Sequence, residues 1–198
     1  MRVFILILVL IFSLQSWTNA DDVRDFEIEG MSIGNSLLDF YTQEEIDSNK
    51  NYYPNSKKFF RSILPAKTDN FERVQVHIKE NDQNYTIHAV SGLIFFMDKK
   101  NSKNDCLKMH EEIKKEISSM LKNIKPTKQE KKIIEHDETG NSVHYPIYYD
   151  FNDSGTEYVK LDCVIYGKEY FEKHRFFDHL RLAFQDEEYS NWLQNEAY

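Results

Sequence analysis

The chain has 198 residues and carries 25 lysine and arginine against 33 aspartate and glutamate side chains, a formal net charge of −8. Phosphate binding needs a basic face and the release of counter-ions, so this acidic balance argues against a nucleic-acid partner. A chain of this length is long enough to bury its own hydrophobic core and to fold without an added stabilising element.

The first twenty residues have the pattern of an export signal. Arg2 is followed by an apolar run over 3–14 and then by a polar stretch that ends at Ala20. A membrane-spanning helix needs about 20 apolar residues, so this shorter run predicts a cleaved signal peptide over 1–20. We therefore expect an exported protein, periplasmic or secreted, without a stable membrane anchor.

The first half of the remaining chain predicts two helices and three strands. Apolar residues at helical spacing predict a helix that begins near Ser32 and reaches Tyr41. The segment from Thr42 to Glu45 has the spacing of a capping box and predicts a short second helix. Alternating apolar and polar positions then predict strands over 59–64, 71–79 and 85–96.

The second half repeats this order with one long helix and four strands. An apolar stripe predicts the helix over 105–123. Acidic residues follow Asp186 in a first turn, where negative charge suits the helix dipole, and predict a short C-terminal helix. Between the two helices, the predicted strands cover 131–137, 143–151, 157–166 and 177–185.

Short polar turns between neighbouring strands predict antiparallel pairing and therefore an α+β fold. We expect antiparallel β-meanders with helices packed on one face, either as one continuous sheet or as two helix-plus-meander pseudo-repeats. The domain prediction is a single α+β domain over 21–198, with 26–98 and 104–198 as alternative subdomains.

The two cysteines, Cys106 and Cys163, are predicted to form a disulfide. Cys106 begins the apolar stripe of the long helix, and Cys163 lies on the apolar side of a strand in which Lys160 and Asp162 take the other side. An oxidising compartment favours pairing of two thiols that face one core. On the chain-entropy treatment the bond would contribute roughly 4 kcal/mol; two buried free thiols are the alternative.

Two family resemblances follow from these residues. The first covers nearly the whole mature chain and is to a family of uncharacterised exported proteins from marine bacteria with small, AT-rich genomes; it implies no known activity. It rests on Cys106, Cys163, the segment Ile28-Glu29-Gly30-Met31-Ser32-Ile33-Gly34-Asn35-Ser36-Leu37-Leu38 and the ending Asn191-Trp192-Leu193-Gln194-Asn195-Glu196-Ala197-Tyr198.

A weaker resemblance rests on Gly30-Met31-Ser32, which opens a predicted helix before a meander. This arrangement is similar to the small outer-membrane assembly lipoproteins and to β-lactamase-inhibitor-like domains, and it implies binding to other proteins. The chain lacks the lipidated cysteine of those lipoproteins.

The sequence contains no motif for a metal, a cofactor or a catalytic nucleophile. The seven histidines are scattered, and none has zinc-ligand spacing. His77 and His88 are predicted as solvated positions on neighbouring strands. The acidic turns at 137–138, 152–154 and 186–188 are predicted to have turn and cap roles. We therefore expect neither a metal site nor a cofactor.

Aromatic residues are the one compositional excess, and aromatic side chains are enriched at recognition surfaces. Because side chains alternate between the two faces of a strand, about half of the strand aromatic residues must fill the core. The outward half is predicted to form a binding face, for which Tyr148, Tyr158 and Tyr166 are the candidates.

These observations favour a non-catalytic binding or envelope-associated domain whose partner is another envelope or secreted protein. The alternative is a small secreted hydrolase whose catalytic residues meet only in the folded chain. A pocket that holds His77 or His88 against a carboxylate would favour the hydrolase, whereas a broad aromatic sheet face would favour the binding domain.

Overall fold

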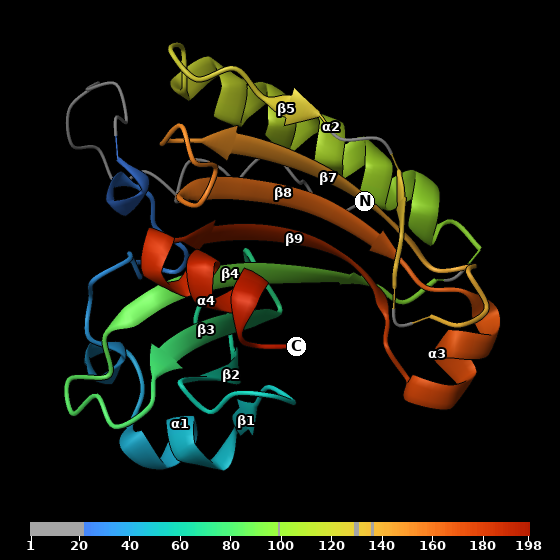
Figure 1. Cartoon of the computed structure of the whole chain (residues 1–198). Helices are drawn as coiled ribbons and strands as arrows, with labels where there is room; N and C mark the ends of the chain where they lie inside the picture. Colours follow the sequence, from blue (N-terminus) through green and yellow to red (C-terminus); the bar gives the residue numbers. More distant parts are fainter. Residues whose placement is uncertain (1–21, 99, 129–130, 136) are drawn as a thin grey trace.

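The computed structural model describes residues 22–98, 100–128, 131–135 and 137–198 and contains an antiparallel sheet with helices on its faces (Figure 1). The predicted signal peptide over 1–20 lies outside these residues. The strands are β1 (Lys50–Tyr52), β2 (Phe59–Pro65), β3 (Arg73–Lys79), β4 (Ile87–Phe96), β5 (Thr127–Lys128), β6 (Lys132–Ile133), β7 (Val143–Asp150), β8 (Tyr158–Ile165) and β9 (Asp178–Gln185). The helices are α1 (Gln43–Ser48), α2 (Ser102–Met120), α3 (Lys168–His174), α4 (Glu187–Asn195) and the 3-10 helices η2 (Val23–Asp25) and η3 (Leu37–Asp39).

The strands form one continuous sheet in the order β1-β2-β3-β4-β9-β8-β7-β5, with β6 also paired to β7. The two halves of the chain join where β4 pairs with β9, from Ala89 opposite Gln185 to Phe96 opposite Asp178. The ranges 26–98 and 104–198 therefore share a single sheet. The predicted α+β class with antiparallel meanders is confirmed.

The long helix α2 covers one face of the sheet. Its stripe of Cys106, Ile113 and Ile117 is buried and belongs to the main apolar core, together with inward positions such as Leu161 and Leu182 on the strands. The N-terminal segment that contains η2, η3 and α1 contributes to the same core. This core buries the alternating apolar positions that the sequence places on one side of each strand.

The C-terminal helix α4 packs on the opposite face, which differs from the expectation of helices on one face only. Trp192 and Tyr189 form a second, smaller core with Phe59 and Ala89. Neighbouring positions such as Phe60 belong to the main core instead, as strand alternation requires. The helix begins as predicted, because Asp186 caps it by accepting a hydrogen bond from the Tyr189 amide at 2.8 Å.

The predicted disulfide between Cys106 and Cys163 is confirmed. Both residues are fully buried, and their Cα atoms lie 6.0 Å apart. The bond joins α2 to β8, a strand in the interior of the sheet. It therefore fixes the helix to the sheet across the main core.

Two predicted elements differ from the structure, and one α-helix and two short strands were not predicted. The helix from Ser32 to Tyr41 is wrong: Gly34 has φ of +89°, which ends helical geometry there, and only η3 forms. The predicted strand over 131–137 is reduced to β6. Helix α3 and the short strands β1 and β5 were missed. The capping box at Thr42 was correct, since its side chain accepts from the Glu45 amide at the start of α1.

Gly92, at the centre of β4, is packed against an aromatic ring. A Cβ atom added at this position would overlap the ring of Phe71, which is buried in the main core. We expect Gly92→Ala to lower the free energy of unfolding by about 1–3 kcal/mol, the usual cost of overpacking. Urea unfolding measures this change.

A double-mutant cycle with Phe71→Leu provides the control for Gly92→Ala. A smaller side chain at position 71 leaves room for the new methyl group, so the two substitutions together should cost less than the sum of their separate costs. Strict additivity would contradict the proposed overlap.

Candidate functional site

The sheet face that α2 leaves uncovered carries the charged residues of β7, β8 and β9. Strand alternation sends Leu161 and Cys163 toward α2, and it sends Lys160 and Asp162 to the other face. Figure 1 places α3 and α4 at opposite ends of β9, so this surface extends between them. We call it the polar sheet face, and it consists of His144, Tyr148, Tyr158, Lys160, Asp162, Tyr166 and Arg181.

Asp162 is a buried anion at the centre of this face. Its side chain is 3% exposed, and Oδ2 accepts hydrogen bonds from His144 Nδ1 at 2.9 Å and Lys160 Nζ at 2.7 Å. Burial raises the pKa of Asp162, but the hydrogen bond from His144 and the charge of Lys160 outweigh it, so that the pKa falls to about 2. The other oxygen, Oδ1, is buried and has no hydrogen-bond partner among the described residues.

Arg181 lies directly opposite Asp162 in the register of β8 and β9. Its Nε and Nη2 atoms donate to Ser91 Oγ at 3.1 and 3.0 Å. No described carboxylate lies within 4 Å of its guanidinium nitrogens, so this half-buried cation has no ion-pair partner in the described part of the chain. A charge taken out of water without a counter-ion costs free energy, and a bound anion would offset that cost.

Tyrosine rings lie on both sides of this charged centre. The rings of Tyr148 and Tyr158 meet edge to face at 5.1 Å, and Lys160 Nζ lies 5.5 Å from the Tyr148 ring centre. At the other end, Tyr166 stacks on Tyr170 of α3 at 5.6 Å. The structure thus places all three predicted tyrosines on one face.

Sequence reasoning missed the charged centre between these tyrosines. The alternation in β8 placed Lys160 and Asp162 on its polar side, and Arg181 occupies the corresponding position in β9. What the sequence did not reveal is that β8 and β9 are neighbours with Asp162 opposite Arg181. The distance between them along the chain hides this pairing, because it depends on the order of strands in the sheet.

His77 is buried, which corrects the prediction of a solvated strand position. It is fully buried under α4, where its Nε2 lies 2.9 Å from the Tyr53 hydroxyl and its ring stacks on Tyr189 at 4.5 Å. Burial lowers the pKa of His77 well below 6.5, and the charges of Arg181 and Arg61 lower it further. The imidazole is therefore a neutral core group.

His88 has a structural role. Its Nδ1 lies 2.7 Å from Oδ2 of Asp186, the residue that caps α4. His144 and Asp162 form the second histidine–carboxylate pair. Within the described ranges, neither His88 nor His144 has a hydrogen bond to a serine, threonine or tyrosine hydroxyl, and no group of three potential metal ligands occurs. His88 does lie against a carboxylate, as the hydrolase alternative requires, but that carboxylate caps α4.

The acidic turns have the roles that the sequence predicted for them. The pKa of Asp137 is lowered chiefly by hydrogen bonding to the Ser142 and Thr139 hydroxyl groups, and the amides of the same two residues also donate to its carboxylate. Asn152 Oδ1 accepts from the Thr156 amide at 3.0 Å. These carboxylate and amide oxygens are occupied by their own loops.

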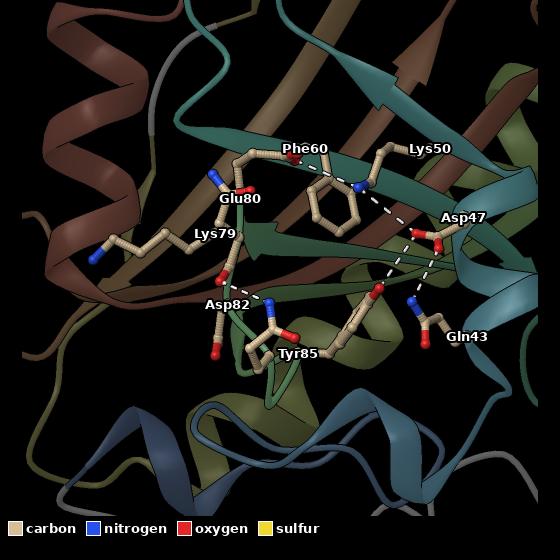
Figure 2. Close-up of a pocket in the computed structure, with 10 residues that line it drawn as sticks. Gln43, Asp47, Lys50, Phe60, Lys79, Glu80, Asp82 and Tyr85 are labelled. Carbon is tan, nitrogen blue, oxygen red and sulfur yellow. Dashed lines mark hydrogen bonds and ion pairs between the residues drawn. The ribbon is translucent and has the colours of Figure 1, made fainter.

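A cavity of about 420 Å³ lies between α1 and the turn after β3 (Figure 2). Its central cation, Lys50, has Nζ at 3.6 Å from Asp47, at 3.5 Å from Glu80 and at 4.1 Å from the Phe60 ring centre. Figure 2 shows the Lys79 side chain extending away from the Lys50 cluster, and it pairs with Glu188. Because the charge of Lys50 is already balanced by two carboxylates, this cavity offers less for a ligand than the polar sheet face.

The fold and the polar sheet face together define an α+β domain with one disulfide and a half-buried charged and aromatic sheet surface. Comparison of the chain with protein-family models, with curated proteins and with solved structures gave no match. The function therefore has to be argued from the site itself.

Proposed function

We propose that the protein is an exported, non-catalytic binding domain that holds an anionic ligand on its polar sheet face. The observation that carries this proposal is the half-buried guanidinium of Arg181, which lacks a carboxylate partner among the described residues. A guanidinium is planar and always charged, and it is suited to bidentate recognition of a carboxylate. Two of its nitrogens are held by Ser91, which fixes the orientation of the group.

Export is supported by the buried disulfide, because disulfides persist in oxidising compartments. The pattern of the first twenty residues points in the same direction. No helix in the described ranges is long and apolar enough to cross a membrane. We place the protein in the periplasm or the extracellular medium, where its ligand would be a component of the envelope or of another secreted molecule.

The proposal is tested with tricarballylate, a tricarboxylate that carries no hydroxyl group. Titration into the ¹⁵N-labelled protein should shift the Nε–H signal of Arg181 and the amide signals near positions 160–162 in a saturable way. Arg181→Gln removes the cation but keeps polar atoms at the site, and it should abolish these shifts.

Lys168→Gln is the charge-matched control, since the Lys168 side chain on α3 is 88% exposed. This variant loses one positive charge far from the centre of the face, and its shifts should match those of the wild-type protein. Shifts that persist in Arg181→Gln, or that centre on the cavity around Lys50, would overturn the proposal.

A further inference from the structure

Arg181 and Asp162 face each other without pairing. Residues directly opposite on antiparallel strands have Cβ atoms about 4.5–5.5 Å apart, close enough for opposite charges to meet. In this structure Arg181 turns to Ser91, and Asp162 turns to His144 and Lys160. One edge of the guanidinium and one oxygen of the carboxylate are left for a third group.

The free edge of the Arg181 guanidinium and the free oxygen of Asp162 need opposite hydrogen-bonding partners. The free edge of Arg181 donates hydrogen bonds and attracts an anion, whereas Asp162 Oδ1 accepts and has no described partner. A simple carboxylate satisfies Arg181 but is repelled by the charge of Asp162. A ligand that carries a carboxylate and a neighbouring hydroxyl group satisfies both.

Asp162 is buried, so a ligand hydroxyl group has to pass the side chains beside it. His144 and Lys160 are 20% and 21% exposed, so they reach solvent while the carboxylate beneath them does not. Lys160 Nζ pairs with Oδ2 of Asp162 and lies 5.5 Å from the Tyr148 ring centre, whereas Oδ1 has no hydrogen-bond partner among the described residues. Because Oδ1 is itself buried, a ligand has to displace a neighbouring side chain to reach it, and Lys160 is the one that it moves.

The tyrosines extend the face beyond a single small molecule. Tyr158 and Tyr166 lie four residues on either side of Asp162, which at about 3.3 Å per residue separates them by about 26 Å. A tyrosine ring has an apolar body and a polar tip. A sugar ring likewise has an apolar face and a hydroxylated edge, so a chain of sugars matches this row of groups.

We propose that the ligand is an acidic oligosaccharide, with the carboxylate of one sugar on Arg181 and a hydroxyl group of the same or the next sugar on Asp162 Oδ1. This inference rests on the proposed function and specifies the ligand class for the same face. It makes Arg181 the anion-binding residue and Asp162 the residue that selects for a hydroxylated acid.

Isothermal titration calorimetry with three probes tests the inference. The probes are trigalacturonate, which has carboxylates and hydroxyls, maltotriose, which has hydroxyls only, and tricarballylate, which has carboxylates only. Trigalacturonate should bind at least about tenfold more tightly than either other probe, since one hydrogen bond to a charged group accounts for a factor of this size. Arg181→Gln should weaken both acids, and Lys168→Gln should weaken neither.

Asp162→Asn and Tyr148→Ser separate the two parts of the inference. Asp162→Asn should remove the preference for trigalacturonate and leave tricarballylate binding equal or tighter, because a repelling charge is lost. Tyr148→Ser, at a half-buried position, should weaken trigalacturonate alone, and it covers the case in which Asp162→Asn fails to fold.

The outcomes distinguish the inference from the proposed function. If tricarballylate and trigalacturonate bind equally and both depend on Arg181, the binding domain stands and the sugar is wrong. If neither acid depends on Arg181, both are wrong. Equal binding of maltotriose and trigalacturonate would also overturn the inference, because the charge on the ligand would then contribute nothing.

Discussion

Replacing Cys106 and Cys163 together by alanine is expected to lower the free energy of unfolding by about 4 kcal/mol. The two residues are separated by 57 positions, and closing a loop of this length in the unfolded chain accounts for that amount on the chain-entropy treatment. Both side chains are fully buried, so the removed sulfur atoms leave some packing loss in addition. The double substitution avoids a lone thiol that would react during the measurement.

Chemical denaturation at equilibrium measures this effect, and the reduced wild-type protein is its control. Reduction breaks the bond but keeps both sulfur atoms in the core. The reduced protein should therefore lose most of the same free energy, and the difference between the two samples reports the packing contribution. In both the double variant and the reduced protein, the free energy of unfolding should fall more steeply with denaturant concentration, because an unfolded chain without the cross-link exposes more surface.

A different result would count against the bond itself. The non-reduced, denatured protein should have a mass two hydrogens below that of the reduced protein and should contain no thiol that reacts with Ellman's reagent. Two reactive thiols in that sample would contradict the disulfide, whatever the stability of the double variant.

The parts of the fold that follow local rules were predictable from the sequence. Alternation in β8 placed Cys163 on the buried face and Lys160 and Asp162 on the other face. Capping residues indicated where α1 and α4 begin. In contrast, α3 has no buried residue, so it carries no apolar stripe from which a helix is predicted. Local signals therefore identified most elements with a buried side and missed α3 and β1, neither of which has a buried residue.

The site depended on information that local patterns do not contain. His77 occupies a polar position in its strand pattern, and it is buried only because α4 returns from the end of the chain to cover it. The strand pattern assigned Asp162 to the polar side of β8, but its position opposite Arg181 depends on the β8–β9 register. Burial and charge at a sheet face are set by strand order, which the sequence left open.

Acidification below about pH 6.5 is expected to destabilise the protein through three imidazoles that stay neutral in the folded state. Burial is the largest cause in each case and lowers the pKa of His77, His110 and His179 below the ordinary value of 6.5. For His77 and His179, the charge of Arg181 lowers the pKa further. His77 also has a buried Nδ1 without a described hydrogen-bond partner.

The sign follows from proton linkage. Between the folded and unfolded pKa values, the unfolded chain binds protons that the folded chain does not, so stability falls as the pH falls. Each such imidazole contributes a slope of at most about 1.4 kcal/mol per pH unit in this window and no slope above it. Asp162 affects stability at lower pH. Its ionised carboxylate stabilises the folded state fully above the pKa of 3.8 in the unfolded chain, and this contribution is lost as the pH falls to the folded-state pKa of about 2.

Urea unfolding followed by tryptophan fluorescence at about pH 7.5 and about pH 5.5 measures the effect. The wild-type protein should lose stability between these conditions, by at most about 4 kcal/mol for three imidazoles. His77→Phe keeps a flat ring against Tyr189 but cannot bind a proton. Its stability should therefore depend less on pH, even where its absolute stability is lower.

His174→Phe is the matched control, because His174 lies exposed on α3 and its replacement should leave the wild-type pH dependence unchanged. The comparison uses the difference between two pH values within each variant, so the loss of the Tyr53 contact in His77→Phe cancels. Parallel loss of stability in wild type and His77→Phe would mean that His77 takes up a proton in the folded state. In that case the neighbouring Arg181 would face a second positive charge, and the charge arrangement of the polar sheet face would need to be redrawn.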